Sequence, residues 1–153
     1  MMMKVKKHPL LTLHEELGDK QGISIACELF AKLYSARGHS EEATAYYEKS
    51  LALCQTLHYQ KGIAKALHRL GEVCAFQCDF LKALEYFDKA IEISRKINNS
   101  LILGSCLTDK GNVLIKLGDI SGARLLQNEL KSTLDFSGNS MLFSYSKPFL
   151  NKM

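Results

Sequence analysis

The chain has 153 residues, a formal net charge of +4, 46% apolar residues and 24% charged residues, values that suit one soluble globular domain. No apolar run approaches the roughly 18 residues of a membrane-spanning helix, and Pro9–Leu13 is too short for a secretory signal, so we expect no membrane association. Acidic and basic residues alternate, which argues against a nucleic-acid surface. The five cysteines lack the spacing of a disulfide framework, and we therefore predict a cytoplasmic location.

A repeat with a period of 40 residues organises most of the chain. Ala43, Ala83 and Ala123 follow one another at this interval, and the register holds without an insertion. A period in this range indicates stacked copies of one helical or mixed unit. In chain order we predict an amino-terminal helix at 1–21 (a partial repeat or a cap), three units at 22–61, 62–101 and 102–134, and a tail at 135–153 that is flexible or folded back.

Each unit has the pattern of two helices joined by a tight turn. In the middle unit, Leu67, Leu70 and Cys74 recur at the spacing of one helix face, and a second apolar stripe begins at Phe80. Both prolines lie near the ends of the chain, so the units contain no helix breaker. The expected turn residues are the helix stops Gly38 and Gly118 and the N-caps Ser40, Asp79 and Asp119.

Small residues recur where the two helices of a unit should touch. They are Ala31, Gly71 and Gly111 on the first helices and Ala43, Ala83 and Ala123 on the second helices. Because the distance between packed helices depends on the side chains at the contact, these positions predict a close seam within each unit. The third unit departs from the pattern, since Lys110 and Gln127 stand where large apolar residues are expected.

The middle unit resembles the tetratricopeptide repeat. Its residues Leu67-x2-Leu70-Gly71-x2-Cys74, then Ala83-x3-Phe87-x2-Ala90, follow that motif, with Leu67 in place of the usual Trp and Cys74 in place of the usual Tyr. The 40-residue period is similar to that of the long repeats in G-protein-signalling modulators and kinesin light chains. The resemblance implies an all-α fold, a right-handed α-solenoid of about three antiparallel helix pairs with an extra amino-terminal helix.

Cys74 and Cys78 lie four residues apart, a spacing at which two thiols on a helix could bind a metal or act in redox chemistry. Shifted by 40 residues, however, Cys78 coincides with Gly38 and Gly118 at the expected turns. We therefore interpret the cysteines as packing residues. No catalytic constellation is present in the sequence, and we predict no catalytic residue, no cofactor and no metal site.

In a solenoid of this kind, the first helix of each pair lines a concave groove. The candidate groove residues are Glu28 and Lys32 in the first unit, Lys65, His68 and Glu72 in the second, and Thr108 and Asn112 in the third. The leading prediction is a non-enzymatic scaffold or adaptor that binds a peptide or helix of a partner protein in this groove. The alternatives are self-association (a homo-oligomer) through exposed apolar end faces, RNA binding, and a groove filled by the tail of the same chain.

Overall fold

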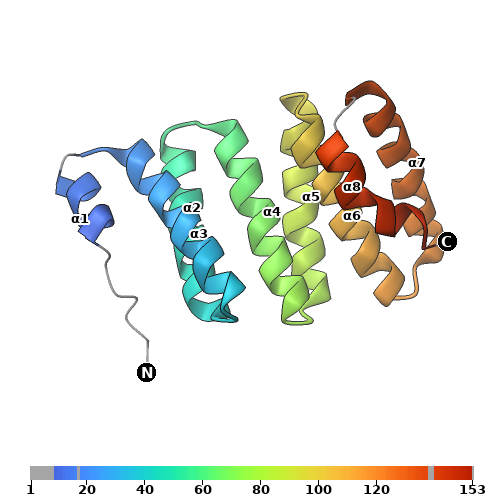
Figure 1. Cartoon of the computed structure of the whole chain (residues 1–153), viewed down its shortest axis with the longest axis horizontal. Helices are drawn as coiled ribbons and strands as arrows, with labels where there is room; N and C mark the ends of the chain where they lie inside the picture. The colour runs from blue at the N-terminus through green and yellow to red at the C-terminus, as the bar shows by residue number, and fades with distance from the viewer. Residues whose placement is uncertain (1–8, 17, 138–139, 153) are drawn as a thin grey trace.

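The computed structural model describes residues 9–16, 18–137 and 140–152. Within these ranges the chain forms eight α-helices and no strand. Neighbouring helices stand side by side along the long axis of the molecule (Figure 1). They are α1 (Pro9–Glu16), α2 (Lys20–Ala36), α3 (Ser40–Thr56), α4 (Gln60–Phe76), α5 (Phe80–Lys96), α6 (Ser100–Lys116), α7 (Ile120–Ser137) and α8 (Ser140–Leu150). No helix in the described ranges has the length and apolar character to cross a membrane.

The 40-residue repeat consists of two half-repeats of equal length. Each of the helices from α2 to α6 has 17 residues, and a three-residue turn separates it from the next helix. One residue in each turn between α1 and α7 has a positive φ, between 51° and 84°, which gives the left-handed conformation that ends a helix. These residues are Gly18, Gly38, His58, Cys78, Asn98 and Gly118, each 20 positions after the previous one.

Four helices begin at a side-chain cap of the expected kind. Asp19, Asp79 and Asn99 accept a hydrogen bond from the backbone N–H three residues further on, and Asp119 accepts one from Gly122. The prediction that Ser40 is an N-cap is wrong. The helix α3 begins at Ser40 itself, and the N-cap before it is His39, whose side chain makes no capping bond.

The helices pack as antiparallel pairs, α2 with α3, α4 with α5 and α6 with α7, and the pairs stack through α3 on α4 and α5 on α6. The small residues lie at the seams. Ala31, Ala43, Ala83 and Ala123 are fully buried, and a Cβ added to Gly71 would lie 2.5 Å from the ring of Phe87, so glycine is required there. The predicted all-α solenoid of three helix pairs is confirmed.

Both ends of the solenoid carry an additional helix. At the amino end α1 buries Leu11 against α2, while residues 1–8 and 17 of the segment predicted at 1–21 lie outside the described ranges. At the carboxyl end α8 begins 40 residues after α6, where the first helix of a further unit would begin. The part of the tail that the structure describes is folded against α6 and α7, and α8 lies across α6 (Figure 1).

Candidate functional site

The first helices of the pairs, α2, α4 and α6, share one side of the solenoid. Although α5 separates α4 from α6 in the chain, α4 and α6 also contact each other directly, which places them on the inner side of the curve. We call the surface of α2, α4 and α6 on this side the groove. All seven predicted groove residues belong to these three helices.

Glu28 on α2 forms ion pairs with two lysines, and the pair with Lys65 joins α2 to α4. Its Oε1 lies 2.9 Å from Nζ of Lys32, one turn further along α2, and 3.1 Å from Nζ of Lys65 on α4. Burial by itself would raise the pKa of the Glu28 carboxyl, but the hydrogen bonds and charges of the two lysines outweigh burial and lower the pKa below its usual value. The carboxylate therefore stays ionised at neutral pH and leaves the two ammonium groups at the edge of an open pocket.

This pocket, between α2 and α4, has a volume of about 330 Å³. Its charged edge is formed by the Glu28 cluster, and its apolar wall is formed by Ile25, Leu29, Leu57 and Tyr59. Ile25 and Leu29 are 52% and 57% exposed, and they lie one helical turn apart on α2. A wall of exposed apolar side chains beside paired charges is the composition expected of a surface that receives another chain.

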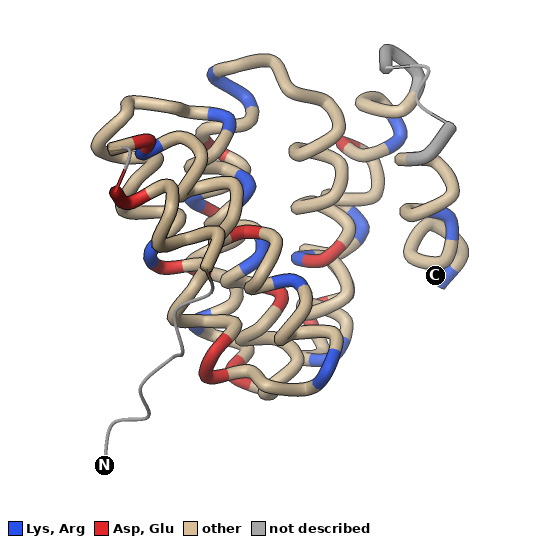
Figure 2. The backbone as a smooth tube through the Cα atoms, turned by 60° about the vertical axis from the view of Figure 1, so that its left-hand side comes forward, with Lys and Arg blue, Asp and Glu red and all other residues tan. Residues whose placement is uncertain are grey.

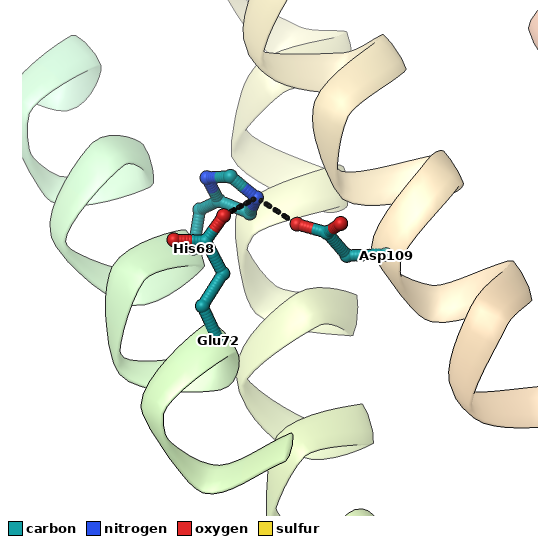
Figure 3. A group of neighbouring side chains, drawn as sticks. All are labelled: His68, Glu72 and Asp109. Atoms are coloured by element: carbon teal, nitrogen blue, oxygen red, sulfur yellow. Dashed lines mark hydrogen bonds and ion pairs between the residues drawn. The ribbon is translucent and has the colours of Figure 1, made fainter. Parts of the chain in front are cut away.

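A second polar group connects α4 to α6 (Figure 3). Nε2 of the buried His68 lies 2.6 Å from Oδ2 of Asp109 and 3.4 Å from Oε1 of Glu72. The remaining oxygens of the two carboxylates are also engaged. Nη1 of Arg69 donates to Oε2 of Glu72 at 2.9 Å, and the hydroxyl of Tyr145 on α8 donates to Oδ1 of Asp109 at 2.7 Å. We call His68, Glu72 and Asp109 the histidine–carboxylate cluster.

Tyr145 acts only as a hydrogen-bond donor in this network. Burial and then the negative charge of Asp109 raise the pKa of its hydroxyl far above the ordinary value, so the proton stays on the tyrosine. A pocket of about 240 Å³ opens beside it, lined by His68 and Glu72 on α4, Leu101 and Ser105 on α6, and Tyr145 on α8. The histidine–carboxylate cluster therefore borders an open space.

The two predicted groove residues on α6 form hydrogen bonds with the carboxyl-terminal segment. Thr108 is buried, and its hydroxyl lies 2.8 Å from the carbonyl oxygen of Gly104 and 2.9 Å from Oγ of Ser146 on α8. Oδ1 of Asn112 accepts a hydrogen bond of 2.7 Å from Nζ of Lys152, which follows α8. The carboxyl-terminal segment therefore engages both predicted residues on α6, whereas the groove stays open over α2 and α4.

The irregular third unit explains where α8 packs. Gln127 stands 40 residues after Phe87, so α7 lacks the ring that fills the space over the glycine in the middle unit. In its place, the ring of Phe149 from α8 packs on Gly111, and Nε2 of Gln127 donates to the backbone oxygen of Phe149 at 2.9 Å. Two features of the sequence are signals for this packing of α8: a glutamine at the apolar position 127, and the start of α8 at Ser140, one 40-residue period after the start of α6 at Ser100. They did not identify the roles of Arg69 or Tyr145.

Four of the five cysteines lie in packing positions, whereas the interpretation of Cys78 as a packing residue is wrong, because it is exposed in a turn. Cys27, Cys54, Cys74 and Cys106 are buried, Cys78 is exposed at the turn before α5, and all five are free thiols. Burial raises the pKa of the Cys27 thiol to about 11 and also raises the pKa of Cys74, so these thiols stay protonated and poorly nucleophilic at neutral pH. In the ranges that the structure describes, the one group of residues close enough to hold a metal ion is the histidine–carboxylate cluster, which contains no cysteine.

Several solved structures share this fold. The chain is 18% identical to aspartyl phosphate phosphatase F from Bacillus subtilis over 85% of its length, with a TM-score of 0.80, and spans 34% of that protein. It is 19% identical to the tetratricopeptide domain of Arabidopsis FLU, with a TM-score of 0.71, over 77% of this chain and 99% of that one. Bacillus thuringiensis PlcR, solved in complex with the peptide PapR7 and DNA, is 19% identical over 97% of this chain, with a TM-score of 0.70, and the chain spans 49% of it.

Sequence comparison points to the same family. No curated protein sequence matches the chain significantly. Two family models, both described as tetratricopeptide repeat, match residues 26–58 and 62–130, which together cover most of the three helix pairs. With the paired helices, the small residues at the seams and these two matches in agreement, the chain belongs to the tetratricopeptide-repeat family.

Proposed function

We propose that the protein is a non-enzymatic interaction scaffold that binds a peptide or helix of a partner protein in the groove over α2 and α4. The observation that carries this proposal is the open pocket between these helices, where exposed Ile25 and Leu29 lie beside the ion pairs of Glu28, Lys32 and Lys65. The apolar wall would bury side chains of the bound segment, and the lysines would bind its carbonyl or carboxylate oxygens.

Three further observations support parts of this proposal. PlcR, of which the chain spans 49%, was solved in complex with the peptide PapR7 and DNA, which supports peptide recognition by this type of fold. The 40-residue spacing supports membership of the long-repeat variety of the family. Five free thiols are typical of a protein that works in a reducing compartment, and this supports a cytoplasmic location.

Peptide selection followed by a binding assay with matched variants tests the proposal. A display library of random linear peptides would be selected on the intact protein, and the affinity of the best peptides measured by fluorescence anisotropy. Leu29→Glu places a charge in the apolar wall and is expected to weaken binding at least tenfold, which corresponds to about 1.4 kcal/mol. Leu81→Glu is the matched control, because Leu81 is 73% exposed on α5, outside the groove.

The two variants separate the groove from the rest of the surface. Equal binding by the wild type and Leu29→Glu would contradict the groove assignment, and so would an equal loss with Leu81→Glu. Circular dichroism of both variants controls for loss of helix content.

Among the alternative functions, self-association is supported by a specific observation. Leu10 and Leu13 on α1 and Phe143 on α8 leave apolar side chains exposed at opposite ends of the solenoid. Stacking of these ends would join chains head to tail, and sedimentation over a concentration series would detect it. The RNA-binding alternative has less support, because lysines and arginines alternate with acidic residues along the helices instead of gathering on one face (Figure 2).

A further inference from the structure

We propose that His68, Glu72 and Asp109 form a binding site for one divalent transition-metal ion of the Zn²⁺ type. Each residue offers one ligand atom, and these three atoms all lie within 4.8 Å of one another. His68 and Glu72 are separated by four residues on α4, which places them on the same face, and Asp109 points at them from α6 (Figure 3). One imidazole and two carboxylates on two rigid helices make a three-ligand site with a remaining position for water.

One of the three distances within the cluster already matches a tetrahedral site, and a small movement of Asp109 would adjust a second. Zn²⁺ binds nitrogen and oxygen ligands at about 2.0–2.2 Å, which separates two ligand atoms by about 3.3 Å. The separation of Nε2 of His68 from Oε1 of Glu72 is 3.4 Å and already satisfies this requirement. The separation of Nε2 from Oδ2 of Asp109 is 2.6 Å, the length of a hydrogen bond, so the carboxylate would move back by about 0.7 Å as the metal replaces the shared proton.

The surroundings hold both carboxylates in the orientation that a metal requires. Arg69 binds Oε2 of Glu72 and Tyr145 binds Oδ1 of Asp109, which leaves Oε1 and Oδ2 directed at the imidazole. In metal sites, hydrogen bonds of this kind to the outer carboxylate oxygens orient the oxygens that bind the metal. The fourth coordination position would face the 240 Å³ pocket that His68 and Glu72 line, where a water molecule has room.

The ligand set favours one class of metal. Ca²⁺ and Mg²⁺ prefer sites built from oxygen ligands alone, whereas an imidazole with carboxylates suits Zn²⁺ and neighbouring first-row ions. Two carboxylates with a neutral imidazole carry a charge of about −2, which Arg69 reduces to about −1, so a divalent cation is electrostatically favoured. Its binding would connect α4 to α6 and, through Tyr145, to α8.

The test is a Zn²⁺ titration of the whole chain by isothermal calorimetry, with Cys78→Gly in every protein because Cys78 is the exposed thiol. We expect one Zn²⁺ per chain, and a dissociation constant at least tenfold higher in Glu72→Gln and in Asp109→Asn. Glu92→Gln, which removes an exposed carboxylate on α5 outside both the groove and the cluster, is expected to bind as the parent does. His14→Gln is a second control, because His14 and Asp19 form a histidine–carboxylate pair to which the described part of the chain adds no third ligand.

Co²⁺ provides a spectroscopic readout of the ligands. Cobalt held by nitrogen and oxygen is expected to give visible d–d absorption without the charge-transfer band of a thiolate, and to shift the NMR signals of residues around His68 and Asp109. The proposal would be overturned by the absence of saturable binding, by equal affinity in the cluster variants, or by a thiolate band. If a cluster variant fails to fold, as circular dichroism would reveal, the position of the Co²⁺-induced NMR shifts in the parent protein decides the question.

Discussion

The ring of Phe149 is the largest buried contact of α8, and Phe149→Ala measures how strongly that helix is held. The side chain is 1% exposed and lies against Gly111, in the space that Phe87 fills in the middle unit. A phenylalanine buries about 150 Å² or more, and at about 25 cal/mol per Å² its removal costs nearly 4 kcal/mol. The methyl group that alanine keeps lowers this cost, and the cavity left behind raises it, so we expect a loss of about 3–4 kcal/mol.

Urea unfolding monitored by far-UV circular dichroism would measure this loss. Phe143→Ala is the matched control, since Phe143 is on the same helix but 50% exposed, and we expect it to cost less than about 1 kcal/mol. Adding Gln127→Phe to Phe149→Ala should restore part of the stability, because a ring on α7 would again cover Gly111 as Phe87 covers Gly71. A loss below about 1 kcal/mol for Phe149→Ala, or a loss equal to that of the control, would refute the packing described for α8.

Three further predictions concern the groove and the thiols. The folded pKa of Glu28 lies below its ordinary value of 4.5, so its ion pairs stabilise the protein above that pH. The difference in unfolding free energy between wild type and Glu28→Gln should therefore shrink as the pH falls through the lowered pKa. A difference that does not depend on pH would contradict this prediction. Cys78 has a φ of 62°, so Cys78→Gly should relieve strain of about 1 kcal/mol and raise Tm by about 2–4 °C. Cys78→Ala should leave Tm nearly unchanged. Equal Tm values for the two variants would contradict the prediction of backbone strain at this turn. Ellman's reagent should modify Cys78 rapidly in the native protein and the four buried thiols only after unfolding, and fast reaction of a second thiol would show that one of them is accessible.

The repeat could be predicted because it is a local pattern. Helix length, turn position and the apolar face of each helix depend on residues within one or two turns, so the 40-residue spacing of Ala43, Ala83 and Ala123 was enough to predict the paired helices. The N-cap of α3 was predicted one residue too late, at Ser40, because serine is a common cap and the turn actually places His39 at that position. Helix boundaries are commonly shifted by a residue or two in this way.

For the groove, the sequence predicted which residues line it but not which of them stay accessible. Spacing along α2, α4 and α6 indicated which residues share a face, but it did not indicate that Thr108 would be buried under α8 or that Asn112 would accept a bond from Lys152. The sequence also gave no reason to connect His68 with Asp109, which are 41 positions apart, or Tyr145 with Asp109, which are 36 apart. These contacts depend on how one helix pair stacks on the next.

By itself, the sequence determined that this chain is a solenoid of paired helices. Turn residues at a constant interval set where each helix ends, and small residues at the same interval set the seam along which it packs on its neighbour. The tertiary structure decided which part of the inner face stays open. A missing aromatic ring at Gln127 leaves space over Gly111, the ring of Phe149 fills that space, and α8 thereby packs against α6 while the pocket between α2 and α4 remains accessible. The physical reason is that burial of apolar surface between distant segments depends on their three-dimensional fit, which no local spacing records.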